Sequence, residues 1–172
     1  MLELNAKLQH SVHIHSGFVY SVMAGWSPAQ RLRLGLEKNL LEKYFPGRVQ
    51  WYDPTGNTVV EVSINTNNGN AYRLRIYLTK DGELGSDFPN SMPDMVVSMS
   101  PRSMLDWGVS DTHHTVGKRD GLLKICHYHP SQWTNESSLH EVFMKGRIWL
   151  EAYEGHIRTG KTMNTFLGEM RG

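Results

Sequence analysis

The chain holds one cysteine, Cys126, and several histidines lie close to it in the sequence. His127 and His129 follow it, and His113 and His114 precede it in an irregular stretch. A thiolate is a nucleophile when a nearby cation or base activates it and the sulfur is accessible. The residue types around Cys126 therefore favour covalent thiol chemistry. The alternative is that Cys126 is a small buried hydrophobic side chain, as most cysteines outside disulfides are.

A zinc site is the strongest alternative from another class of function. The thiol of Cys126 and the imidazoles of His127, His129 and either His113 or His114 are ligands that zinc prefers. Their spacing argues against such a site, because residues 126 and 127 point to opposite sides of an extended chain. The sequence also has no Cys-x-x-Cys or His-Glu-x-x-His motif. We therefore expect neither a metal nor another cofactor.

A helix is predicted to begin at Ser27-Pro28-Ala29-Gln30. This stretch has a serine cap, a proline at the first helical position and a glutamine three residues after the cap. Apolar residues then recur at helical spacing until Pro46-Gly47 ends the helix. We expect the core-facing stripe to be Leu32, Leu36, Leu40, Leu41 and Tyr44. Residues 1–26 have no clear period and are interpreted as an N-terminal extension of uncertain structure.

Four runs with strand character follow this helix, and the first three are joined by short turns. They are Val49–Tyr52, Val60–Ile64, Tyr72–Leu78 and Met95–Met99. Consecutive alternating runs joined by short turns predict an antiparallel meander with one buried face. The connection to the fourth run holds Phe88-Pro89 and Met92-Pro93, which favour an extended path.

The remainder of the chain predicts a loop and then helices. Residues 100–124 keep no period and are interpreted as a long ordered loop that leads to Cys126. Ser138 and Glu141 have the spacing of a capping box, and an apolar stripe follows them. A short last helix is expected around Met163 to Leu167. The whole pattern predicts one α+β domain over residues 1–172, with an N-terminal helix, a four-stranded antiparallel meander, a cysteine-bearing loop and C-terminal helices.

Composition limits the partners that we expect. Eighteen basic and seventeen acidic residues give a formal net charge of +1, which provides no basic surface for nucleic acid. No apolar run approaches the ~20 residues that span a bilayer. The start of the chain lacks the layout of a signal peptide. We therefore expect a soluble cytoplasmic protein that binds neither nucleic acid nor a membrane.

The order of these elements and two local motifs resemble the ubiquitin-conjugating enzyme (UBC) fold. Members of that family carry a Tyr-Pro or Phe-Pro step before a second proline and the fourth strand, which Phe88-Pro89 and Met92-Pro93 resemble. They then carry a Gly-x-Ile-Cys-Leu motif followed closely by a tryptophan and a helix. The stretch from Gly121 to His127, with Trp133 after it, is similar to that motif.

On this resemblance, Cys126 is the thioester-forming cysteine of a ubiquitin-conjugating-like transferase. The eukaryotic family places a His-Pro-Asn motif before the cysteine, and its asparagine is credited with supporting the oxyanion during amide formation. The corresponding stretch here, Asp111 to Gly117, has no proline and no asparagine. His114 and His127 are therefore the candidates for a general base or for oxyanion support.

These departures resemble the divergent bacterial ubiquitin-conjugating-like proteins of antiphage operons. In the cyclic-oligonucleotide-based systems (CBASS), a protein of this type is thought to attach the C-terminal glycine of a cGAS-like nucleotidyltransferase to other molecules. The resemblance implies such a nucleotidyltransferase as a partner, together with an activating enzyme. A catalytically inactive UBC-like binding module is a further alternative. Cys126 argues against it, because inactive relatives have lost that cysteine.

Overall fold

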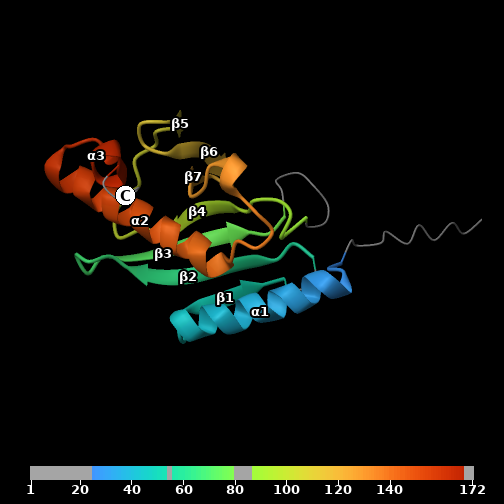
Figure 1. Cartoon of the computed structure of the whole chain (residues 1–172). Coiled ribbons are helices and arrows are strands. Elements are labelled where there is room, and N and C mark those ends of the chain that lie inside the picture. The colour runs from blue at the N-terminus through green and yellow to red at the C-terminus, as the bar shows by residue number, and fades with distance from the viewer. Residues whose placement is uncertain (1–24, 54–55, 80–86, 169–172) are drawn as a thin grey trace, which may run out of the picture.

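The structure is a computed structural model that describes residues 25–53, 56–79 and 87–168. It is an α+β fold in which the long helix α2 lies across one face of an antiparallel sheet and α1 runs beside β1 (Figure 1). The helices are α1 (Pro28–Tyr44), α2 (Leu139–Thr159) and α3 (Met163–Gly168). The strands are β1 (Val49–Tyr52), β2 (Val59–Asn65), β3 (Ala71–Tyr77), β4 (Asp94–Met99), β5 (Val109–Ser110), β6 (Thr115–Arg119) and β7 (Leu122–Ile125).

The predicted four-stranded meander is confirmed as β1 to β4, but the sheet does not end there. Over the described residues it has seven strands in the order β1-β2-β3-β4-β7-β6-β5. The expected strand count of four is therefore wrong, and the stretch predicted to be a long loop contributes β5, β6 and most of β7. These strands are short, and a register shift interrupts the pairing of β6 with β7. Such short and irregular strands leave no alternating pattern in the sequence.

Helix α1 begins as predicted, but it faces the core with a different side. Ser27 and Gln30 form the expected capping box. Leu32 and Leu36, expected to face the core, are 69% and 59% exposed. Leu41 of the expected stripe is buried, together with Glu37, which was not expected to face the core. Tyr44 is 48% exposed, so the predicted stripe is wrong for Leu32, Leu36 and Tyr44.

The buried carboxylate of Glu37 explains the orientation of α1. It accepts a hydrogen bond of 2.8 Å from Arg33 Nε and another of 2.8 Å from the backbone N–H of Leu139. Leu139 is the first residue of α2, so Glu37 satisfies one of the N–H groups that a helix start leaves without a partner. Arg33 also donates to the carbonyl of Ser137 at 2.8 Å. This network fixes α1 against the start of α2.

Helix α2 confirms the predicted capping box and the predicted apolar stripe. Ser138 caps the helix together with Glu141. The stripe is buried against the sheet, and its members are Leu139, Val142, Phe143, Trp149, Leu150 and Tyr153. Gly146 brings the helix close to Met95 of β4, because a Cβ at that position would lie 2.4 Å from Met95 Sδ. The short last helix is confirmed as α3.

Trp26 belongs to the core, although the expected N-terminal extension includes it. Its side chain is 4% exposed, and Nε1 donates to Thr58 Oγ1 at 2.8 Å. Residues 1–24 of the extension lie outside the described residues.

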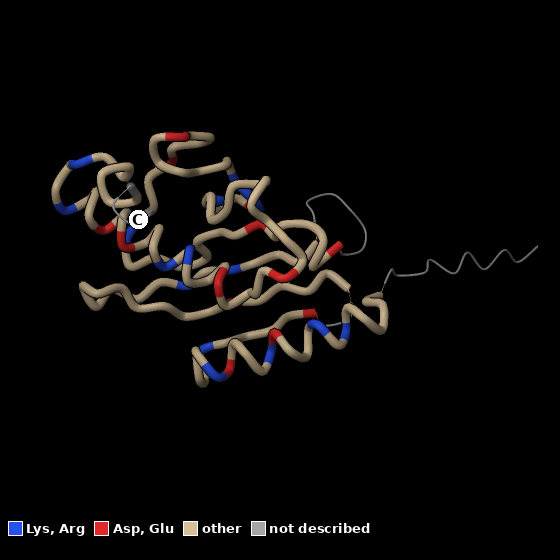
Figure 2. Tube along the Cα trace, in the orientation of Figure 1, with Lys and Arg blue, Asp and Glu red and all other residues tan. Residues whose placement is uncertain are grey.

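None of the described helices combines the length and the apolar character that crossing a membrane requires. Basic and acidic residues are interspersed along α1 (Figure 2).

Candidate functional site

Cys126 directly follows β7 and is held mainly through its backbone. Its N–H donates to the carbonyl of His114 at 2.9 Å, which continues the pairing of β7 with β6. Its side chain is partly exposed, whereas the neighbours Ile125 and His127 are buried. Sγ lies 3.5 Å from the carbonyl oxygen of Tyr128, to which the thiol can donate. A partly exposed thiol at a strand end is accessible to a reaction partner.

His114 is the sequence-predicted site residue that the structure brings to Cys126. Its φ of 53° lies in the left-handed region, which few residues other than glycine adopt. Its carbonyl accepts from Cys126 and also from Trp149 Nε1 at 3.1 Å. Two donors from different elements therefore fix the backbone at this unusual conformation. Outlying backbone geometry that its surroundings hold in place is often found at functional sites.

The imidazole of His114 is oriented by α3. Nε2 lies 2.7 Å from Oδ1 of Asn164. Because an amide oxygen can only accept, Nε2 carries the proton in this contact. In the neutral imidazole, Nδ1 then has the lone pair and can accept a proton. This tautomer suits a general base rather than a donor to an oxyanion.

His127 lies in the interior, on the side of the extended chain opposite Cys126. Nε2 lies 2.8 Å from the carbonyl oxygen of Pro93, and Nδ1 is buried without a hydrogen-bond partner. Burial lowers the pKa of His127 to about 4, against an ordinary value of 6.5. The ring is therefore neutral near pH 7. This position gives no support to a role of His127 as base or oxyanion donor.

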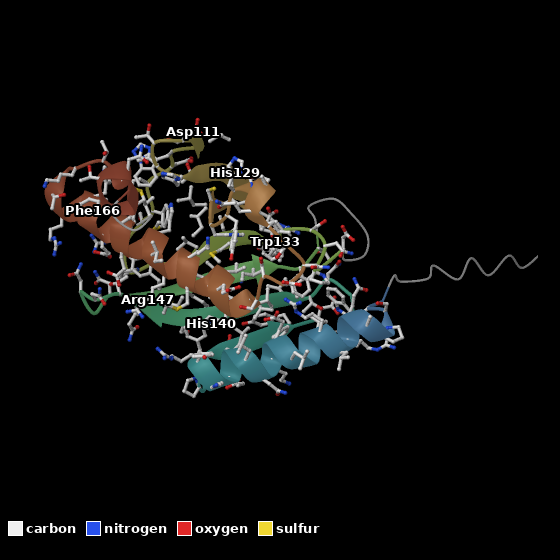
Figure 3. All side chains as sticks on the ribbon, in the orientation of Figure 1. Asp111, His129, Trp133, His140, Arg147 and Phe166 are labelled. Atoms are coloured by element: carbon white, nitrogen blue, oxygen red, sulfur yellow. The ribbon has the colours of Figure 1, made fainter. Side chains whose placement is uncertain are left out.

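The other two nearby histidines are each engaged by local partners. His113 stacks on Trp107 with ring centroids 4.1 Å apart, and its Nδ1 lies 2.9 Å from Ser110 Oγ. Burial lowers the pKa of His113, and the charges of neighbouring histidines lower it further. His129 caps a short 3₁₀ turn, with Nδ1 2.7 Å from the hydroxyl of Ser131. In the view of Figure 3, His129 lies above Trp133.

Aromatic residues after Cys126 tie the cysteine segment to the proline-bearing connection and to α2. Trp133 Nε1 donates to the carbonyl of Pro89 at 3.0 Å. The Tyr128 and Trp133 rings meet edge to face with centroids 5.6 Å apart. Lys145 of α2 lies 3.7 Å from the Tyr128 ring centroid. Trp133 therefore has a structural role beneath the cysteine segment. Lys145 is the cation that packs on the Tyr128 ring of this segment.

The geometry gives no support to the zinc alternative. In the part of the chain that the structure describes, no group of three or more histidine, cysteine, aspartate or glutamate side chains is placed to hold a metal ion. The reason is local, because Cys126 and His127 point apart and His127 is bound to a backbone carbonyl.

Two residues of this region had not been identified from the sequence. Asn164 lies far along the chain from Cys126, and nothing in the sequence around it marks a site. Lys145 reads as an ordinary charged residue of an amphipathic helix. Only the packing of α3 and α2 against the β6–β7 region places the two side chains here.

Comparison with known proteins gives no significant match to a family model, to a curated protein or to a solved structure. The fold and the site therefore define the protein only as an α+β protein with a single cysteine presented at the end of an inner strand.

Proposed function

We propose that the protein is a ubiquitin-conjugating-like acyl carrier of UBC type, with Cys126 as the thioester-forming residue. One observation carries the proposal, namely the partly exposed Cys126, held by the carbonyl of His114, whose imidazole Asn164 orients. A nucleophile with an oriented base close to it in the fold is the arrangement that acyl transfer through a covalent intermediate needs.

The order of the elements adds support. A capped helix, a four-stranded meander with the Phe88-Pro89 connection before its fourth strand, the cysteine and a long capped helix follow one another as in the family that the sequence resembles. The contact of Trp133 with Pro89 also joins the two motifs on which the resemblance depends. The sheet extends beyond the meander by β7, β6 and β5, which is a departure from the expected pattern.

The proposed reaction has two steps. In the first, the Cys126 thiolate attacks the carbonyl carbon of a C-terminal glycine that an activating enzyme has converted into an acyl adenylate with ATP. A C–S bond forms, the C–O bond to AMP breaks, and AMP leaves. In the second, an amine attacks the thioester, a C–N bond forms and the C–S bond breaks. The amine proton passes to Nδ1 of His114, and the thiolate is regenerated.

The partner that supplies the glycine is proposed from the resemblance. It is a cGAS-like nucleotidyltransferase, and the setting is a bacterial antiphage operon with the protein in the cytoplasm. The oxyanion of the second step needs a donor, and Asn164 is the amide that the structure offers in this region. Since Oδ1 of Asn164 faces His114, its Nδ2 group is directed elsewhere and can donate.

The test is reconstitution with the candidate nucleotidyltransferase, an activating enzyme and ATP. Wild-type protein is expected to form an adduct that a reducing agent removes. Cys126→Ser is expected to form an adduct that resists the reducing agent, because an oxyester replaces the thioester. Cys126→Ala is expected to form none.

Two results would contradict the proposal. One is an adduct that persists in Cys126→Ala, which would place the attachment on another residue. The other is the absence of any adduct with every candidate partner, together with one zinc ion per chain in the purified protein. The second result would revive the metal-binding alternative.

A further inference from the structure

A groove of about 360 Å³ lies between the end of α1, the end of β2 and α2. Phe45 and Met144 contribute to its apolar part, and Phe45 is 6% exposed. Tyr44 and His140 stack at its side with ring centroids 4.1 Å apart. The volume is within the range of small-molecule sites, roughly 300–1,000 Å³. The groove therefore has an apolar interior with an aromatic wall.

Cations lie around this interior. Arg48 and Arg147 both line the groove. Figure 3 shows His140 and Arg147 along the same helix, α2. Lys43 lies 5.3 Å from the Tyr44 ring centroid. None of the described residues that line the groove is a carboxylate.

The arginines are anchored but have donors left. Arg147 Nε lies 3.8 Å from Glu151, and one terminal nitrogen of Arg147 donates to Asn67 Oδ1 at 3.2 Å. The guanidinium of Arg48 lies 5.9 Å from the Phe45 ring centroid. A guanidinium has five N–H donors, so these contacts position each group without exhausting it. Glu151 partly offsets one charge, and the groove keeps an excess of cations.

We propose that this groove binds a small aromatic anion, that is, a planar ring that carries a phosphate or carboxylate group. The ring packs on the Tyr44–His140 wall and against Met144, because aromatic faces favour stacked or edge contacts. The anionic group accepts hydrogen bonds from Arg48 and Arg147, whose planar donors match two oxygens at once. This site is independent of the thioester chemistry at Cys126.

Phenyl phosphate is the probe for this site, and inorganic phosphate and benzyl alcohol are its matched controls. NMR titration of the full chain is expected to show saturable shifts of the His140 ring and the Met144 methyl group with phenyl phosphate. The two controls each lack one half of the recognised chemistry. They are expected to bind at least about tenfold more weakly.

Variants separate the charge from the fold. Arg48→Gln with Arg147→Gln is expected to weaken phenyl phosphate binding at least about tenfold, whereas Arg158→Gln, on an exposed part of α2, leaves it unchanged. Met144→Glu places a negative charge in the apolar part of the groove and keeps both arginines, so it is expected to weaken binding as well. Thermal unfolding of each variant checks that the fold is kept.

Three results would overturn the proposal. The first is the absence of saturable shifts at His140 and Met144 in the wild-type protein. The second is inorganic phosphate or benzyl alcohol binding as tightly as phenyl phosphate. The third is unchanged affinity in the folded double-arginine variant or in Met144→Glu. The ligand comparison uses wild-type protein alone, so its outcome does not depend on any variant folding.

Discussion

Asn164 and His114 come from elements far apart in the sequence, yet one hydrogen bond joins their side chains. Under the proposed chemistry, Asn164→Ala removes both the group that orients the imidazole and the candidate oxyanion donor. We expect thioester formation to persist and transfer to an amine to slow by about 10²-fold, as the loss of an oxyanion donor or a general base does. Single-turnover transfer from preloaded thioester to free lysine measures this.

The control for that variant is Asn39→Ala, which changes an exposed residue of α1 and is expected to keep the wild-type rate. His114→Asn provides an independent check, because it removes the proposed base and leaves Asn164 in place. Wild-type transfer rates in both Asn164→Ala and His114→Asn would exclude this pair from the reaction.

His127 makes stability depend on pH. Its pKa is about 4 in the folded protein against an ordinary 6.5, so the unfolded chain binds more protons at intermediate pH. The stability that depends on a neutral His127 is fully present above pH 6.5 and is lost as the pH falls toward 4. The fall in pKa corresponds to about 3 kcal/mol. His113, whose pKa burial also lowers, adds a slope of the same sign. Urea unfolding at several pH values measures the loss.

His127→Gln isolates this contribution, because a glutamine amide can donate to the Pro93 carbonyl and does not titrate. We expect it to flatten the profile between pH 6.5 and 4. His129→Gln, at an exposed position, serves as the control and should keep the wild-type slope. Equal slopes in all three proteins would show that His127 is not the source.

At the scale of single residues, the sequence indicated Cys126 because one thiol among imidazoles is chemically distinctive. It could not separate the roles of the histidines. Whether His114 or His127 faces the solvent depends on strand pairing, and the partner of His114 is supplied by α3. Asn164 had no local signal, because a tertiary contact alone brings it to the site.

At the scale of elements, the junction of α1 with α2 depends on the buried carboxylate of Glu37. Glu37→Gln keeps the shape and removes the charge that Arg33 binds, which leaves a half-buried guanidinium without its counter-ion. We expect a loss of about 2–3 kcal/mol of unfolding free energy, measured by urea denaturation. Glu42→Gln, on an exposed part of the same helix, is expected to stay within about 0.5 kcal/mol of wild type. Equal losses of unfolding free energy in Glu37→Gln and Glu42→Gln would show that the junction of α1 with α2 does not depend on the buried carboxylate.

The same residue explains why the helix was predicted correctly and its orientation was not. The capping box and the leucine spacing are local signals, and they determined where α1 begins and that it is a helix. The side that faces the core depends on a contact with the first residue of α2. A pattern of leucines favours burying Leu32 and Leu36, whereas the ion pair of Glu37 with Arg33 lies on the adjacent side of the helix, about 100° away.

The strands also divide into those that the sequence predicted and those that it did not. β2 and β3 are long and alternate, so their pattern was sufficient to predict them. β5 has only two residues, and β6 has a register shift. Gly108 just before β5, Gly117 within β6 and Gly121 between β6 and β7 all have positive φ, which glycine adopts most readily. In the sequence, such glycines are equally typical of a loop.

At the scale of the whole molecule, the sheet and α2 must lie at a fixed separation for the β6–β7 region to meet Trp149. Trp149 donates to the carbonyls of both His113 and His114, so α2 holds the backbone that in turn binds Cys126. The packing of α2 on the sheet and the position of Cys126 are therefore linked by hydrogen bonds. A change in the spacing between α2 and the sheet is expected to shift the backbone at Cys126 through Trp149.

Gly146→Ala tests that spacing. A Cβ there would lie 2.4 Å from Met95 Sδ and 2.5 Å from Leu74 Cδ1, so α2 must move away from the sheet or both side chains must shift. We expect a loss of about 1–3 kcal/mol in unfolding free energy, as overpacking usually causes, and a changed rate of Cys126 alkylation by iodoacetamide. Gly35→Ala in α1 meets nothing within 4 Å and is expected to stabilise the protein by about 0.5–1 kcal/mol, with the alkylation rate unchanged. An unaltered alkylation rate in a destabilised Gly146→Ala protein would show that the spacing between α2 and the sheet does not affect the accessibility of Cys126.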